Sequence, residues 1–402
     1  MPLLRNLLIG VLLLSALTFV ALFGQLPSLR RTPVGWLQRL LCIHAPNALR
    51  RLDRAATGGR VTRKSKKLGT YLFYERNPVV LIIFLFILTG AVGLFLWNAV
   101  HRLPTKHFLP VPLLVALPYL FTYLTVTCTS HYITPANHAA RMADHPYDHI
   151  LFQPNVPCKT CNLVKPARSK HCSFCGHCVA KCDHHCPWVN NCLGRGNYHY
   201  FLALLLSTGL VQLYGSYLSW YLLRPYMTVD LTTPLVSWAR LESIGNAIVA
   251  CLNHGGISIA GVGLLAISTA CLPLGLLAYH LYLVWAGLTT NESVKWSDLK
   301  EDLADGYVFR AHKHDLRAHN RARQQERTRP NGSQNPALNA HDDECATEQF
   351  MAISDVVIVR TNNGRPPQGQ ETLWTRVWSL SEIDNIYDLG CAQNFAEVLH
   401  GR

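Results

Sequence analysis

The sequence predicts an α-helical polytopic membrane protein with about five transmembrane helices, a small cytosolic Cys-rich module and a cytosolic C-terminal tail. Three observations lead to this prediction. Of the 402 residues, 49% are hydrophobic and only 15% are charged, which is a low charge content for a soluble protein. Long uncharged runs recur along the chain, and positive charges gather in only some of the segments between them. Eight of the 14 Cys lie between Cys158 and Cys192.

Several stretches are long and apolar enough to cross a bilayer as a helix, which takes roughly 20 residues. There are five of them: Leu7–Gly24, Pro78–Trp97, Leu109–Thr127, Tyr200–Leu223 and Ile257–Trp285. A buried helix of a soluble domain would explain one such run, but not five. The first run could also be a signal peptide with Arg5 as its charged start, and the distribution of positive charge decides between the two.

Positive charges are unevenly distributed between these spans. Segment 25–77 carries 12 Lys and Arg and segment 129–199 carries seven, whereas 98–108 and 225–256 carry only Arg102, Lys106 and Arg240. Because positive loops stay in the cytosol, five spans place the N-terminus outside and the Cys-rich loop and tail inside. A cleaved signal peptide would put the most basic loop on the wrong side. That loop is also expected to contact anionic lipid, at about 1 kcal/mol per cation.

These boundaries divide the chain into an N-terminal anchor, a basic cytosolic loop, a transmembrane hairpin, a Cys-rich domain, a second hairpin and a cytosolic tail. The segments are 1–24, 25–77, 78–128, 129–199, 200–287 and 288–402. Within the tail, the polar composition of about 312–345 predicts a disordered linker, while 379–399 regains apolar residues and is expected to dock. The triplets at Asn291 and Asn331 would be cytosolic and therefore unglycosylated. No nucleic-acid fold signature accompanies the net charge of +13, so nucleic acid is not an expected partner.

The spacing of Cys and His in the Cys-rich loop is typical of zinc sites. Paired Cys-x2-Cys units about ten residues apart let thiolates hold an ion, and a cytosolic loop disfavours disulfides. The loop has too few apolar residues to fold alone, so metal binding would supply folding energy. Eight Cys plus His171, His177, His184 and His185 make 12 possible ligands, whereas two tetrahedral ions need eight. An unbound thiol in such a site is either a nucleophile or a buried spare Cys.

Local geometry favours Cys186 over Cys182 as that nucleophile. In an extended chain His184 and Cys186 face the same way, while His185 faces the opposite side, toward a metal. A base beside a thiol is the arrangement that activates a Cys nucleophile. The same alternation turns Asp183 away from His184, so a contact between them requires a local turn that the sequence does not predict.

The Cys-rich loop resembles the DHHC palmitoyltransferase family. Its pattern begins at Cys158-x2-Cys161, continues through Lys165-Pro166-x-Arg168-x2-His171-Cys172, and ends in Asp183-His184-His185-Cys186-Pro187-Trp188, Asn191-Cys192, Gly194, Asn197 and Phe201. Thr289-Thr290-Asn291-Glu292 is similar to the TTxE motif of the family, and Asn385–Gly390 with Asn394-Phe395 to its C-terminal motif. The resemblance covers roughly 75–300 and 380–400. The N-terminal span, basic loop and long tail most resemble the fungal members of the endoplasmic reticulum that acylate SNAREs and other single-span proteins.

The resemblance implies a protein S-palmitoyltransferase with two interleaved structural zinc ions and palmitoyl-CoA as co-substrate. Cys186 would carry the acyl group, His184 would act as general base, and Asp183 would orient His184. The substrates would be membrane proteins with juxtamembrane Cys. The first zinc ion would be held by Cys158, Cys161, His171 and Cys178, and the second by Cys172, Cys175, His185 and Cys192. Cys182 and His177 would then be free, Cys182 most simply for packing.

Predictions also cover residues around the Cys-rich loop and in the tail. Trp188 would close over the head of the acyl chain or anchor at the membrane interface. Lys165, Arg168 and Lys170 would meet CoA phosphates or form a solvated basic face on anionic lipid. By resemblance, the module would pack against the structural residues Thr289, Thr290, Glu292 and Asn385. A capping box from Thr290 to Glu292 is not expected, because the two are only two residues apart. His280, a polar residue in the fifth span, marks a pocket or lies at the cytosolic membrane edge.

Other functions explain part of these observations. A non-enzymatic membrane adaptor, or a RING-like ligase, would keep the zinc ligands but would not need His184 or an unligated Cys186. A channel would need polar residues within its spans, and these spans are almost entirely apolar. The adaptor is the main alternative to the acyltransferase. Endoplasmic reticulum is the expected location and Golgi the second choice.

Overall fold

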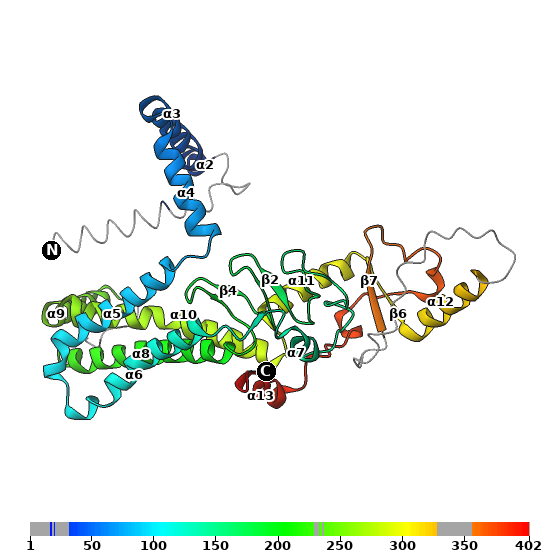
Figure 1. Ribbon diagram of the computed structural model, residues 1–402. Helices are drawn as coiled ribbons and strands as arrows, with labels where there is room; N and C mark the ends of the chain where they lie inside the picture. The colour runs from blue at the N-terminus through cyan, green and yellow to red at the C-terminus, as the bar shows by residue number, and fades with distance from the viewer. Residues whose placement is uncertain are drawn as a thin grey trace. The chain divides into compact units, whose positions relative to one another are not determined.

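The computed structural model describes residues 32–228, 237–327 and 356–401, and the single residues Leu17, Val20, Thr232 and Pro234. The chain forms two compact units, Met1–Asn77 and Pro78–Arg402 (Figure 1). The first predicted span, Leu7–Gly24, lies outside the described residues except for Leu17 and Val20.

The basic segment of the first unit is helical where the structure describes it. It forms α2 (Pro33–Arg39), a π-helical turn (Leu40–His44), α3 (Ala45–Thr57) and α4 (Arg60–Tyr74). Gly58 and Gly59 turn the chain after α3 with φ angles of 65° and 80°, which glycine adopts without a Cβ clash. Asp53 of α3 accepts hydrogen bonds from the backbone N–H groups of Val61 and Thr62, so it satisfies donors in the first turn of α4.

The second unit is built on apolar helices that stand side by side (Figure 1). Among the described residues, four helical stretches are long and apolar enough to cross a membrane: Val79–Arg102, Thr105–Thr127, Tyr198–Tyr226 and Trp238–Trp285. They contain α5 (Val79–Ala99), α6 (Pro110–Thr127), α8 (Tyr198–Leu223) and α10 (Val262–Trp285), with 3-10 turns at Val100–Arg102, Thr105–His107 and Arg224–Tyr226. The last four predicted spans are thus found as long apolar helices.

One helix was not anticipated. The segment 225–256, which lies between the fourth and fifth predicted spans, contains α9 (Trp238–Gly256). Ser237 caps this helix by accepting a hydrogen bond from the backbone N–H of Arg240. A π-helical turn (Ile257–Gly261) links α9 to α10, and Gly256 has a φ of 60° at this junction. The break in the helix therefore falls at a glycine.

The Cys-rich module is made of short strands. Antiparallel strands β1 (Tyr132–Ile133), β3 (His177–Val179) and β2 (Lys170–Cys172) form one sheet, and β4 (His185–Cys186) pairs with β5 (Asn191–Cys192). Helix α7 (His138–Ala143) follows β1. In these ladders His171 lies opposite Cys178, and His185 lies opposite Cys192. The buried residues Val189, Leu193, Phe201 and Leu204 join the module to α8.

The tail returns to the module and the end of α10. Its helices are α11 (Thr290–Ala304), α12 (Lys313–Arg327) and α13 (Cys391–Leu399), with 3-10 turns at Glu371–Leu373 and Leu380–Glu382. Its three strands form one sheet in the order β7 (Val356–Arg360), β6 (Val308–His312) and β8 (Thr375–Arg376). The prediction of a disordered linker at 312–345 is wrong for its first half, because α12 is helical there. Residues 328–355 lie outside the described part. Helix α13, which lies in the 379–399 segment that was expected to dock, packs against α8 and α10.

Candidate functional site

The predicted catalytic residues lie together beside strand β4. Asp183 Oδ2 is 2.6 Å from His184 Nδ1, and Cys186 follows two residues later in β4. Since Asp183 occupies Nδ1, the nitrogen of His184 that remains for the thiol is Nε2. Cys186 and Asp183 are 4% and 3% exposed, whereas the His184 side chain is 31% exposed. The thiol is thus sheltered, while its base can still meet an incoming group.

The contact between Asp183 and His184, which the family resemblance implied but local strand geometry did not predict, is held by a distant residue. Thr290, at the start of α11, donates its backbone N–H to Asp183 Oδ1 at 2.7 Å and its hydroxyl to Asp183 Oδ2 at 3.0 Å. Both carboxylate oxygens are therefore fixed by the tail. The positive end of the α11 dipole also favours a negative charge at this place.

The protonation of this pair follows from its partners. Burial disfavours the charged form of Asp183, but its bonds with His184 and Thr290 outweigh burial and lower the pKa of that carboxyl. Burial also opposes a charge on His184, yet the hydrogen bond to Asp183 and the nearby Cys186 thiol raise the pKa of this imidazole from 6.5 to about 9. The site therefore stabilises an imidazolium beside a carboxylate, which is what a base needs after it has taken a thiol proton.

The start of α11 corrects one prediction about the TTxE motif. Thr289 is the N-cap: its side chain accepts from the backbone N–H of Glu292, and Glu292 accepts from the backbone N–H of Thr289. A capping box is present, and its absence was wrongly predicted because Thr290 was taken as the cap. The correct spacing of three residues leaves the Thr290 hydroxyl free to hold Asp183.

Arg168 is not available to CoA. It is 2% exposed and its guanidinium forms two bonds of 2.7 Å with the Glu292 carboxylate, which is 1% exposed. It also donates to the carbonyl oxygen of Gly287 at 3.1 Å and lies 4.6 Å from the ring centroid of Tyr387. The prediction that Arg168 meets CoA phosphates or a solvated face is therefore wrong. Lys170 is exposed and Lys165 half-buried, and their proposed contacts stay predictions.

The C-terminal motif satisfies the carbonyl groups at the end of α10. Asn385 donates to the carbonyl oxygen of Ala286 at 3.4 Å, in the place the sequence indicated. Asn394 donates to the carbonyl oxygen of Trp285 at 3.2 Å and to Asp388 Oδ1 at 2.8 Å. These carbonyls have no partner within a helix that ends there, so the tail supplies donors that would otherwise have to come from water.

Two groups of Cys and His side chains are placed so that each could hold a metal ion. They are Cys158, Cys161, His171 and Cys178, and Cys172, Cys175, His185 and Cys192, with the ligand atoms of each group within 4.8 Å of one another. Tetrahedral zinc with S and N ligands would separate two such atoms by about 3.6 Å. Cys158 Sγ and Cys161 Sγ lie 3.6 and 3.4 Å from His171 Nδ1, and Cys175 Sγ lies 3.4 Å from His185 Nδ1. Both groups fit zinc.

Cys182 and His177 also lie outside the two metal-binding sets, and both pack against neighbouring side chains. Cys182 is 4% exposed and packs with Val179 and Cys192, and burial raises the pKa of its thiol to about 12. A thiol in that state is a poor nucleophile, so packing is the role that remains. His177 is exposed and stacks on Tyr132 at 4.9 Å between ring centroids.

An apolar cavity of about 270 Å³ lies between the membrane helices. Its walls come from α5, α6, α8 and α10, with Trp188 as the residue contributed by the Cys-rich module. The Trp188 indole is 54% exposed and meets the edge of Phe84 with centroids 6.3 Å apart. Trp188, two residues from Cys186, thus connects the thiol-bearing segment to a cavity suited to a hydrocarbon chain.

Sequence reasoning undervalued His280 and missed Tyr198. His280 on α10 is 1% exposed, its Nδ1 lies 4.0 Å from Asp183 Oδ2, and Tyr198 places its hydroxyl 2.9 Å from the same nitrogen. A polar residue in an otherwise apolar span was the available signal for His280. Tyr198 carried no such signal, because a Tyr at the first turn of a span is usual at a membrane interface.

Comparison with known proteins gives a consistent result. Residues 151–297 match the model of the family described as DHHC palmitoyltransferase. The chain is 40% identical to Palmitoyltransferase swf1 of Emericella nidulans, an alignment that covers 99% of this chain and 97% of that protein. It is 36% identical to Palmitoyltransferase SWF1 of Neurospora crassa over 96% of this chain and 90% of the relative. Palmitoyltransferase swf1 of Schizosaccharomyces pombe is 31% identical over 97% and 94%.

Proposed function

The chain belongs to the DHHC palmitoyltransferase family and is a protein S-palmitoyltransferase, and we propose that Cys186 carries the acyl group from palmitoyl-CoA to a cysteine of a membrane protein. One observation supports this assignment above the others. Cys186, which belongs to neither Cys-His set, lies two residues from His184; His184 is hydrogen-bonded to Asp183, which Thr290 holds, and the nearby Trp188 lines an apolar cavity between membrane helices. An adaptor would need neither the base nor the unligated thiol.

The proposed reaction has two steps with the same base. In the first, His184 takes the Cys186 proton, Sγ attacks the thioester carbon of palmitoyl-CoA, the bond from carbon to the CoA sulfur breaks, and the CoA thiolate takes the proton. In the second, His184 takes the proton of a substrate thiol, which attacks the acyl carbon on Cys186 and releases the Cys186 thiolate for reprotonation. Asp183 stabilises the imidazolium in both steps.

The two Cys-His groups are proposed to hold structural zinc ions. Each group supplies four protein ligands, so a tetrahedral ion would have no open position for substrate. Zinc in these sites would supply folding energy to a module built from strands of two or three residues. The strand pairing sets His185 opposite Cys192, so the two could share one ion, while Cys186, the residue after His185, packs in the apolar cluster with Leu193 and Leu204.

The apolar cavity is the proposed site for the acyl chain, with Trp188 near its carboxyl end. The thiol-bearing module joins α8 directly after Asn197, so Cys186 is tethered to the membrane helices. A lipid chain can therefore stay among α5, α6, α8 and α10 while its thioester meets the thiol.

Orientation, location and partners extend the proposal. We expect the module and tail to face the cytosol, the basic α3 and α4 to lie on anionic lipid, and the protein to reside in the endoplasmic reticulum, with Golgi as second choice. SNAREs and other single-span proteins with juxtamembrane Cys are the expected substrates.

The orientation can be tested by glycosylation in microsomes. Asn291 and Asn331 should remain unglycosylated, because they would be cytosolic. The matched control is Asp230→Asn, which creates an acceptor triplet ending at Thr232 in the loop between the last two hairpin helices, on the opposite side. Glycosylation at Asn291 or Asn331, with the Asp230→Asn site unused, would overturn the orientation.

The function is tested by intact mass spectrometry of the purified, zinc-loaded protein after incubation with palmitoyl-CoA. One palmitoyl adduct that neutral hydroxylamine removes is expected, followed by its transfer to an added membrane-anchored peptide that contains Cys. A protein that binds two zinc ions per chain but gains no adduct would support the adaptor instead.

A further inference from the structure

A second imidazole lies beside the proposed catalytic carboxylate. The His280 side chain is 2% exposed, and its ring lies nearly parallel to that of His184, with 22° between the planes and 5.7 Å between centroids. Its Nδ1 is 4.0 Å from Asp183 Oδ2, the same oxygen that His184 bonds. His280 comes from α10 and His184 from the Cys-rich module, so this stack joins the membrane helices to the catalytic segment.

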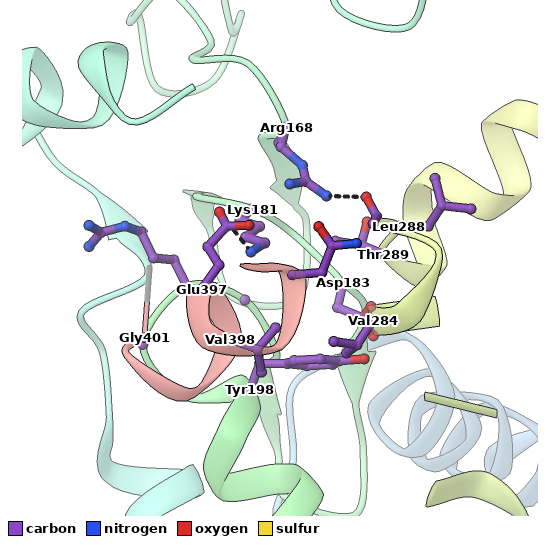
Figure 2. A pocket seen from close by; sticks show the side chains of 15 residues that line it. Arg168, Lys181, Asp183, Tyr198, Val284, Leu288, Thr289, Glu397, Val398 and Gly401 are labelled. Atoms are coloured by element: carbon purple, nitrogen blue, oxygen red, sulfur yellow. Dashed lines mark hydrogen bonds and ion pairs between the residues drawn. The ribbon is translucent and has the colours of Figure 1, made fainter. Parts of the chain in front are cut away.

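His280 is itself held in a defined position. Tyr198 of α8 places its hydroxyl 2.9 Å from His280 Nδ1, and the ring of Phe201, also on α8, meets the His280 ring at 88° with centroids 5.2 Å apart. Phe201 makes a similar edge contact with His184 at 5.9 Å. A polar side chain buried in an apolar span costs free energy unless it is paired, and the Tyr198 hydroxyl supplies the partner for His280. Figure 2 shows Tyr198 and Asp183 on the wall of one small pocket.

The donor atoms of Asp183, His184 and His280 lie within 4.8 Å of one another, a spacing that could also suit a metal ion. Each is already engaged, however: His184 with Asp183, His280 with Tyr198, and the Asp183 carboxylate with Thr290. Hydrogen bonds therefore account for all three groups. A zinc content of two per chain is expected, with no third ion at this place.

We propose that His280, fixed by Tyr198, is a positioning residue for the acyl-transfer reaction. Its ring supports the plane of His184 and, together with Thr290, confines the Asp183 carboxylate, so that His184 Nε2 stays directed at the Cys186 thiol. This inference rests on the proposed function. A base held in one orientation reacts faster, and a small displacement of a catalytic group can cost on the order of 100-fold in rate.

The test compares His280→Phe, which keeps a ring but loses both nitrogens, with His280→Asn, which keeps a hydrogen-bonding group near the position of Nδ1. Single-turnover acylation by palmitoyl-CoA is measured in the full-length, zinc-loaded protein. His280→Phe should lower the rate constant on the order of 10- to 100-fold and leave the palmitoyl-CoA concentration for half-maximal rate within about twofold. His280→Asn should recover a large part of the lost rate.

Two further variants keep the test decisive if His280→Phe folds poorly. Tyr198→Phe removes only the hydroxyl that holds His280; it should slow acylation severalfold and have no added effect on His280→Phe, because the two act as a unit. The matched control is His107→Phe. His107 is 5% exposed and its Nδ1 is 2.7 Å from the hydroxyl of Tyr214. It lies just before the start of α6, whereas the Cys-rich module follows the end of that helix. It should lower thermal stability and leave the rate constant within about twofold.

Several results would overturn the inference. They are parent-like acylation by His280→Phe, a change confined to the half-maximal concentration, no recovery by His280→Asn, or an equal loss of rate in His107→Phe. Failure of the proposed function itself is distinguishable, because then the parent protein, with its two zinc ions, would gain no acyl group at all.

Discussion

Cys186→Ser is expected to abolish palmitate transfer while the protein keeps its zinc and its stability. A serine hydroxyl has nearly the volume of the thiol but is a far weaker nucleophile at neutral pH, and loss of such a group costs at least on the order of a thousandfold in rate. Cys186 belongs to neither Cys-His group, and it packs with Val189 and Leu193. Transfer to a membrane-anchored peptide, the hydroxylamine-sensitive adduct, bound zinc and the thermal midpoint would be measured together.

The matched control is the same substitution at a proposed zinc ligand of the same module. Cys172→Ser leaves three ligands in the second group, so it should release one zinc ion per chain and lower the thermal midpoint before any catalytic effect is considered. The two variants should thus differ in zinc content although both change one Cys to Ser. Retained transfer by Cys186→Ser would refute the nucleophile. Full zinc and parent stability in Cys172→Ser would remove Cys172 from the ligand set.

Arg168→Ala is expected to destabilise the second unit by about 3–5 kcal/mol, because it leaves the Glu292 carboxylate buried without its partner. The pair is almost inaccessible to water, with side-chain exposures of 2% and 1%. Arg168 also bonds the carbonyl of Gly287 and lies over Tyr387, so its removal weakens the attachment of α11 and the C-terminal motif together. Because α11 also begins at the Thr290 that holds Asp183, transfer activity should fall as well.

A neutral pair and a surface pair serve as controls. Arg168→Met with Glu292→Gln removes both charges but keeps an acceptor for the backbone N–H of Thr289, so it should be more stable than Arg168→Ala alone. The exposed pair Arg310 and Glu382 lies at 3.7 Å, and Arg310→Ala should change stability by less than about 1 kcal/mol. Thermal unfolding in detergent measures all three. Equal midpoints for Arg168→Ala and Arg310→Ala would show that the buried pair contributes no more stability than the surface pair.

The misassignment of Arg168 shows where sequence reasoning fails. A basic residue in a polar loop reads as solvated or as a phosphate contact, and nothing local distinguishes Arg168 from Lys165 or Lys170. What distinguishes it is Glu292, more than a hundred residues later, whose carboxylate neutralises it in a buried site. The same holds for Asp183, whose hold on His184 depends on Thr290.

Composition errors in the tail and between the spans have a local cause. Polar composition predicts a linker in the stretch that forms α12, and segment 225–256 connects two apolar runs. Helix α9 nonetheless forms, with Ala247 and Cys251 buried in the unit. Helix α12 follows β6, whose Val308 packs in a core with Leu299 and Ile358. Packing by neighbouring elements overrides weak local preference.

The sequence by itself predicted the four described apolar spans and a zinc-binding Cys-rich module, and it favoured Cys186 beside His184; the division of the ligands into two sets came from the family resemblance. These depend on chain-local rules: the length needed to cross a bilayer, the spacing that lets two side chains reach one ion, and the alternation of an extended strand. Only the tertiary structure decided how Thr290 and His280 surround Asp183, and why Arg168 is buried. Those contacts join segments far apart in the chain, and a buried charge is tolerable only where such a distant partner reaches it.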